Sequence, residues 1–317
     1  MTSARVPSAE DRALCILGQR SIHTTPTPYR SSGAEVDAPR SSRTIEASLD
    51  SLHKSLAVRA EPVQPENHSL VQSCTMRRFS EDMRAISSDL ARSPLFASIR
   101  PGKRKLKDEL LPSPDGVSIH YRGEQLDQAD CDVFMQLIHE ARGQVVGPHS
   151  PIRINRADLL VQTGRDVGGR NYQWLAASLS RLRDCRLTIE NKRHRLETSL
   201  ILKILTDKAE GTFEVLFDPD IVKMFLGNEY TLVEWKKRKM FSKRVDLAKW
   251  LHAFTSSHAR GRQRWKIATL LTLCGYASPL RKFREALTEA LGELARLDII
   301  TGVSFYENDT KVRWVRL

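Results

Sequence analysis

The clearest pattern of apolar and polar positions lies in the segment 154–190. Leu159 and Leu160 give a short predicted helix its buried side, and Asn155 with Asp158 three residues later is typical of a helix N-terminus. A glycine-rich turn then separates this helix from a second one. The segment ends in a predicted strand. Helix, tight turn, helix and strand is an order typical of a DNA-reading module.

The second helix is expected to begin near Arg170 and to commit one face to a core. Its apolar positions recur in steps of three and four residues, at Tyr172, Leu175, Leu179 and Leu182. The other face is polar and basic, and Arg and Gln there can pair with base edges or phosphates. The candidate DNA-binding residues are Arg170, Asn171, Gln173, Trp174, Ser178 and Arg181. An ordinary solvated face of an amphipathic helix is the alternative.

A second copy of this arrangement is predicted near the C-terminus. A short apolar helix over 267–274 ends at Gly275, and Ser278 with Pro279 starts a long helix. One stripe of that helix is apolar and consists of Leu280, Phe283, Leu287, Leu291, Leu294 and Leu297. Cationic side chains gather at its N-terminal end, where the helix dipole favours anions. A DNA phosphate backbone near this end would therefore offset the unfavourable positive charge.

Two strands, 299–305 and 310–316, follow and are joined by a Glu-Asn-Asp turn. They predict a hairpin of the wing type, with basic side chains along it. The candidate DNA-binding residues of this half are therefore Ser278, Arg281, Lys282, Arg284, Glu285, Lys311 and Arg313.

The first half completes the same plan. Its further predicted elements are a strand at 117–121, a helix at 131–141, a strand at 152–154 and a wing hairpin of 198–205 with 212–217. The sequence therefore predicts an α+β fold with tandem winged-helix domains, over 89–235 and 236–317, behind a largely disordered N-terminal tail, 1–88.

The tail is rich in Pro, Ser, Thr and Arg and has no sustained apolar periodicity, so it cannot bury enough surface to offset the entropy of ordering. Ordered structure is expected from about Arg92. An island at 44–58 repeats apolar residues with helical spacing. It predicts either a short helix that docks on a partner or a transient helix.

Composition adds a strong positive charge. The chain has 317 residues, with 50 Lys and Arg against 38 Asp and Glu, a net charge of +12 and a pI near 9.6. This charge fits nucleic acid, although acidic membranes and proteins also attract basic chains. The basic run 236–239 has three interpretations: a nuclear-import signal, a contact with the DNA backbone or a solvated linker. Because no apolar run approaches the ~20 residues of a membrane span and no signal peptide is recognised, a cytoplasmic location is expected.

Signs of catalysis are missing from the sequence. The five cysteines are scattered without paired spacing, and the histidines form no HExxH or His-x-His pair. There is no Gly-x-x-x-x-Gly-Lys-Ser/Thr loop for an ATP-driven protein, and no metal-binding His pair for a nicking one. The sequence predicts a non-enzymatic binder with no catalytic residues, metal or cofactor.

Several motifs in one order resemble the TrfA family of plasmid replication initiators. They are GEQLDQAD at 123–130, Tyr172 with LSRL at 179–182, LAKWLH at 247–252, SSHA at 256–259, and Phe283-Arg284 with Ala290-Leu291. The similarity runs from roughly residue 90 to the C-terminus and does not include the tail. It implies two winged-helix domains that bind direct repeats, called iterons, in double-stranded DNA at a plasmid origin.

The resemblance also implies melting of an adjacent AT-rich segment, with single-stranded DNA as a second partner, and recruitment of the host replicative helicase and host initiator. The reading helices would be 170–183 and 278–296. Family members also contact the sliding clamp. Here no clear Gln-Leu-x-Leu-Phe clamp motif is present, and 72–76 and 93–96 are poor substitutes, so that contact stays open. A homodimer away from the origin is suggested by the resemblance alone.

The residues are also compatible with two other functions. A winged-helix transcriptional repressor would use the same helices but leave the DNA double-stranded. An interaction protein would use its basic faces to bind acidic partners.

Overall fold

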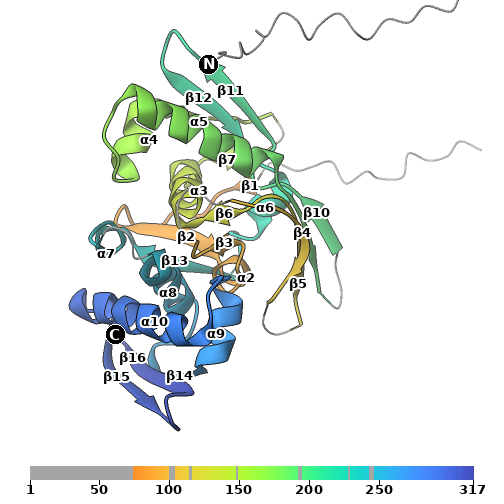
Figure 1. Cartoon of the computed structure of the whole chain (residues 1–317). Helices are drawn as coiled ribbons and strands as arrows, with labels where there is room; N and C mark the ends of the chain where they lie inside the picture. Colours follow the sequence, from red (N-terminus) through yellow and green to blue (C-terminus); the bar gives the residue numbers. More distant parts are fainter. Residues whose placement is uncertain are drawn as a thin grey trace, which may run out of the picture. The chain divides into compact units, whose positions relative to one another are not determined.

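The computed structural model describes residues 74–99, 104–113, 116–147, 149–191, 195–227, 229–242 and 246–317, all within the compact unit Asn67–Leu317. Helices and strands are mixed throughout, as predicted (Figure 1). Buried hydrophobic side chains of these residues form two clusters, one from Met76 to Ala253 and one from Phe241 to Trp314. The division into a tail and two domains stays a prediction. The helix predicted at 44–58 lies outside the described residues.

The first half is built around α3 (Gln128–Ala141), whose residues are nearly all buried. Asp127 and Asp130 form a capping box at its N-terminus, which satisfies backbone N–H groups that the helix leaves free. The elements after α3 include β8 (Ile152–Asn155), α4 (Arg156–Gln162) and α5 (Gly169–Asp184). Asn155 caps α4 as predicted, accepting two backbone N–H bonds at 2.8 and 3.2 Å.

Two antiparallel sheets complete this half. One has the order β11-β12-β8, with β11 (Lys203–Asp207) and β12 (Thr212–Leu216) forming a hairpin. The other has the order β10-β9-β5-β4, from strands β4 (Leu106–Leu111), β5 (Ser118–Glu124), β9 (Arg186–Glu190) and β10 (Arg195–Thr198). The predicted wing 198–205 is wrong in its first part, because Thr198 pairs with β9 and the hairpin begins at Lys203.

Regular structure begins earlier than predicted. Strand β2 (Met83–Ser87) pairs with β13 (Tyr230–Glu234), so the expectation of order only from about Arg92 is wrong. The physical reason is that β13 gives β2 a hydrogen-bonding partner distant in sequence. The smaller elements of this part are β1 (Cys74–Thr75), α2 (Ser88–Ala91), β3 (Phe96–Ala97), β6 (Leu126–Asp127), β7 (Val145–Val146), α6 (Pro219–Lys223) and α7 (Trp235–Lys239).

The second half consists of α8 (Asp246–Ser256), β14 (Gly261–Lys266), α9 (Ile267–Leu273), α10 (Leu280–Arg296), β15 (Ile300–Tyr306) and β16 (Lys311–Arg316). Its sheet has the order β14-β16-β15. The predicted apolar stripe of α10 is buried at Phe283, Leu287, Leu291 and Leu294. The N-cap is Pro279, one residue later than predicted, and no side chain caps the helix.

Both halves follow one order of elements. Each has a helix, a strand, two helices joined by a turn, and a hairpin whose second strand pairs with the first strand (Figure 1). Strands β9 and β10 are inserted before the hairpin of the first half. Within the described part of the chain, no helix combines the length and apolarity needed to cross a membrane.

Candidate nucleic-acid interface

Helix α5 buries its apolar stripe and exposes only part of its predicted polar face. Leu175, Leu179 and Leu182 are in the core, as predicted. Arg170 and Gln173 are exposed. These two residues have the long polar side chains that can reach the edges of bases in a groove.

Ser178 and Arg181 point inward, so the prediction that they face DNA is wrong. Ser178 is fully buried and donates its hydroxyl to Asp130 of α3 at 2.6 Å. Arg181 forms an ion pair with the same carboxylate, and its Nη2 donates to Oδ1 of Asp130 at 2.8 Å. The reason is that the buried carboxylate on α3 requires donors, and α5 supplies them.

Arg104 completes this cluster by bonding both Asp127 and Asp130. Burial alone would raise the pKa of Asp130, but the hydrogen bond from Arg181 and the charge of Arg104 outweigh it and lower the pKa. Burial and the neighbouring Asp130 raise the pKa of Asp127 to about 6. The cluster therefore keeps Asp130 ionised and joins α3 to α5.

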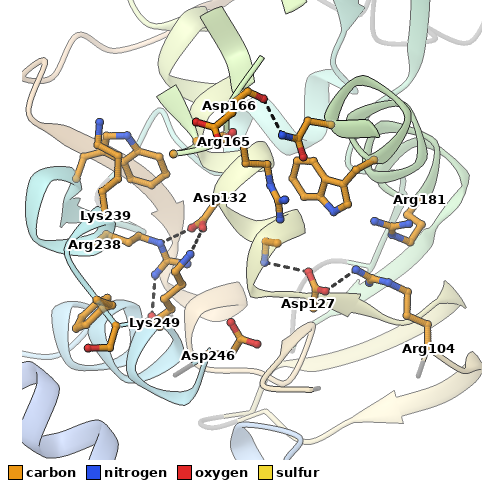
Figure 2. A pocket seen from close by; sticks show the side chains of 18 residues that line it. Arg104, Asp127, Asp132, Arg165, Asp166, Arg181, Arg238, Lys239, Asp246 and Lys249 are labelled. Carbon is orange, nitrogen blue, oxygen red and sulfur yellow. Dashed lines mark hydrogen bonds and ion pairs between the residues drawn. The ribbon is translucent and has the colours of Figure 1, made fainter. Parts of the chain in front are cut away.

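Asn171 and Trp174 stabilise the turn before α5. The Arg165 guanidinium lies 3.4 Å from the centre of the Trp174 ring. Asn171 donates its amide to the carbonyl of Asp166 at 2.7 Å. Both predicted residues also line a cavity of about 700 Å³ (Figure 2). Their side chains are half-buried, so they are less available to a groove than Gln173 is.

The cavity in Figure 2 lies where α3, α7 and α8 meet, and an ion cluster joins these helices there. The Nε of Arg238 lies 2.5 Å from Asp132, and its Nη2 donates to Gln128 at 2.9 Å. Lys249 bonds the second oxygen of Asp132. Burial would raise the pKa of Asp132, but the charges of Arg238 and Lys249 lower it.

The basic run 236–239 forms most of α7, so its interpretation as a solvated linker is wrong. Lys236 pairs with Asp82 at 3.0 Å, and Lys237 pairs with Glu234 at 3.1 Å. Arg238 is buried in the cluster just described. These partners fix the run to the fold. The other two interpretations stay predictions.

The start of α10 presents its predicted cations to solvent. The Arg281 side chain is 82% exposed and lies 3.5 Å from Glu285, itself a predicted contact. Lys282 is also exposed. Arg284 is half-buried, and its Nε is buried without a hydrogen-bond partner among the described residues. Ser278 precedes the helix and is partly exposed.

The second hairpin carries Lys311 and Arg313, as predicted. Lys311 pairs with Glu307 at 2.6 Å, and the Arg313 guanidinium lies 5.7 Å from the ring centre of Tyr306. Strand β14 pairs with this hairpin and carries three cations that were not among the predicted contacts: Arg262, Arg264 and Lys266. Their alternation in the segment GRQRWK is the strand signal that would have placed them on one face.

Comparisons with known proteins agree with the resemblance seen in the motifs. The Escherichia coli plasmid replication initiator protein TrfA is 31% identical over 228 residues, which are 68% of this chain and 57% of that protein. The chain therefore spans little more than half of this relative. Among solved structures, RctB domains 2–3 share 11% identity and a TM-score of 0.47, covering 70% of this chain and 94% of that one.

The Pi initiator protein in complex with iteron DNA shares 13% identity and a TM-score of 0.48, covering 76% of this chain and 99% of that one. The family model described as TrfA protein matches residues 63–314. Because that match includes well over half of the sequence, this chain belongs to the TrfA family.

Proposed function

We propose that this protein is a plasmid replication initiator that binds iterons in the double-stranded DNA of a plasmid origin. Membership of the TrfA family carries the proposal. Melting of an adjacent AT-rich segment, contact with the exposed single strand, and recruitment of the host replicative helicase and host initiator belong to the same proposal. So does a homodimer away from the origin. No catalytic step is part of this function.

The repeated order of elements supports a DNA-binding role for each half. We assign both halves as winged-helix domains, with α5 and α10 as reading helices and the hairpins β11–β12 and β15–β16 as wings. Each reading helix has a buried apolar stripe and an exposed end that carries basic side chains. A rigid helix that presents long polar side chains fits a major groove.

The charge and the duplication suggest how affinity and specificity arise. A net charge of +12 favours attraction to phosphates, which weakens as salt increases. Specificity needs a few base contacts, each worth about 1–3 kcal/mol. Two linked domains that read one repeat multiply modest preferences, because the second binding event becomes intramolecular.

We expect Gln173→Ala to weaken binding to a repeat by about 1–3 kcal/mol without destabilising the fold, because Gln173 is exposed on α5. Fluorescence anisotropy with repeat and scrambled duplexes measures this change. Ser178→Ala is the matched control on the same helix. Because the Ser178 hydroxyl donates a hydrogen bond to Asp130, this substitution should lower the stability of the fold. It should leave the repeat preference of the folded protein unchanged. An unchanged repeat affinity in Gln173→Ala would remove this residue from the reading face.

A further inference from the structure

The sheet β14-β16-β15 has an outer face that is strongly basic. Residues paired in antiparallel register point to the same side of a sheet, and alternate residues along a strand share that side. Arg264 is paired with Arg313, and Lys266 with Lys311. With Arg262 two residues before Arg264, this face collects five cations over two neighbouring strands. They are called the β14–β16 basic face below.

Little in the described structure neutralises this face. Lys311 pairs with Glu307, whereas the other four cations form no ion pair or side-chain hydrogen bond among the described residues. Like charges directly opposite each other on paired strands are destabilising. Two such pairs lie side by side here. An external anion would therefore relieve repulsion within the sheet.

The third strand adds hydrogen-bond donors to the same face. Ser304 is paired with Arg313, and Tyr306 is paired with Lys311. Their hydroxyls extend the donor surface of the cations across the sheet. The acidic residues Glu307 and Asp309 lie beyond it, in the turn at the hairpin tip. The chemistry that such a surface recognises is a run of phosphodiester groups.

The corresponding sheet of the first half provides an internal comparison. On its outer face Arg153 is opposite Glu214, and Asn155 is opposite Thr212. Lys203 is opposite Leu216. Positive and negative charges there are mixed, although the order of strands is the same. A concentration of cations is therefore not a requirement of this sheet, and it distinguishes the second half.

We propose that the β14–β16 basic face binds the phosphate backbone of a second duplex segment, separate from the one that α10 reads. Val312 and Trp314 alternate with the cations of β16 and are buried in the core that also contains the apolar stripe of α10. The basic face and this core therefore lie on opposite sides of the sheet. A duplex seated on α10 would leave the basic face free for another segment.

A duplex suits this face better than a single strand does. Surfaces that bind single strands stack bases on exposed aromatic side chains. Tyr306 is the only aromatic residue among the described positions of this outer face, and it is half-buried with Arg313 over its ring at 5.7 Å. Contacts are therefore limited to the backbone, and this favours the regular phosphate rows of a duplex.

The test uses the full chain with the three β14 substitutions Arg262→Gln, Arg264→Gln and Lys266→Gln combined, so the hairpin assigned as a wing is left intact. Protein held on a bead by a repeat-bearing duplex is given a labelled duplex without repeats, and captured label is measured. We expect the triple variant to capture about tenfold less label, while its affinity for the repeat changes by less than about twofold. The salt dependence of binding to the duplex without repeats should become shallower by roughly 2 to 3 in log–log slope.

The matched control is Arg153→Gln, on strand β8 at the outer face of the first sheet and outside its wing, and it should change neither measurement. Thermal unfolding should show no loss of stability in the triple variant, because the substitutions remove like-charge pairs. Capture that is equal in the triple variant and the parent would overturn the proposal. So would a parent that captures no second duplex, or one that prefers a single strand of equal length.

The inference rests on the proposed function for the duplex that α10 reads and for the choice of repeat DNA as the anchor. Failure of the parent chain to bind the repeat would contradict the proposed function. Repeat binding without capture would contradict this inference alone. The salt slope on DNA without repeats needs no anchor, so an unchanged slope in the triple variant would overturn the inference in either case.

Discussion

Replacing Arg238 by alanine should reduce the free energy of unfolding by about 3–5 kcal/mol, because it removes the buried partner of the Asp132 carboxylate and leaves that carboxylate with Lys249 alone. Arg238 is 1% exposed and lies 2.5 Å from Asp132 of α3, while it also donates to the Lys249 carbonyl of α8. It therefore joins elements of both halves of the fold. Urea unfolding followed by circular dichroism measures the change.

The neighbouring lysine provides the control for that experiment. Lys239 is exposed in the same short helix, α7, and has no ion pair among the described residues. Its replacement by alanine should change stability by less than about 0.5 kcal/mol. A loss below about 1 kcal/mol in Arg238→Ala would show that the cluster is not what joins α3, α7 and α8.

Asp130→Ala should also destabilise the chain by about 3–5 kcal/mol, since it removes the shared partner of Arg104, Arg181 and Ser178. The change also removes half of the capping box of α3. Asp184→Ala, at an exposed carboxylate on α5, is the control and should stay within about 0.5 kcal/mol.

Acid titration of stability gives a second signature of Asp130. Its pKa is lowered by folding, so its contribution is complete above the unfolded pKa of about 3.9 and is lost as pH falls through the lower folded pKa. The parent should therefore lose more stability than Asp130→Ala does when pH falls below about 4. Parallel losses in the two proteins would contradict this role.

The sequence predicted the elements whose signals are local. The stripe of α5, the Asn155 cap and the stripe of α10 depend on residues within a few turns of one another. It missed β2, where Arg84 is buried beside Gln136 of α3 and 4.9 Å from the Trp235 ring centre. No alternation of apolar and polar residues marks that strand, because it is buried on both sides.

Candidate site residues were harder to place, because their burial depends on partners that are distant in the sequence. Ser178 and Arg181 have the polarity of a solvent-facing stripe, but their partner Asp130 is 48 residues from Ser178 in the sequence. Only the packing of α5 on α3 shows that these side chains turn inward. Gln173 and Arg281 needed no distant partner, and the structure leaves both exposed.

The most direct test of the proposed function is permanganate footprinting of a supercoiled plasmid that carries direct repeats beside an AT-rich segment. The purified chain is added alone and then with the host initiator. The account predicts protected repeats and, next to them, thymines that become reactive as the segment opens. Protection without reactive thymines under both conditions would contradict an initiator and favour a repressor that leaves DNA double-stranded.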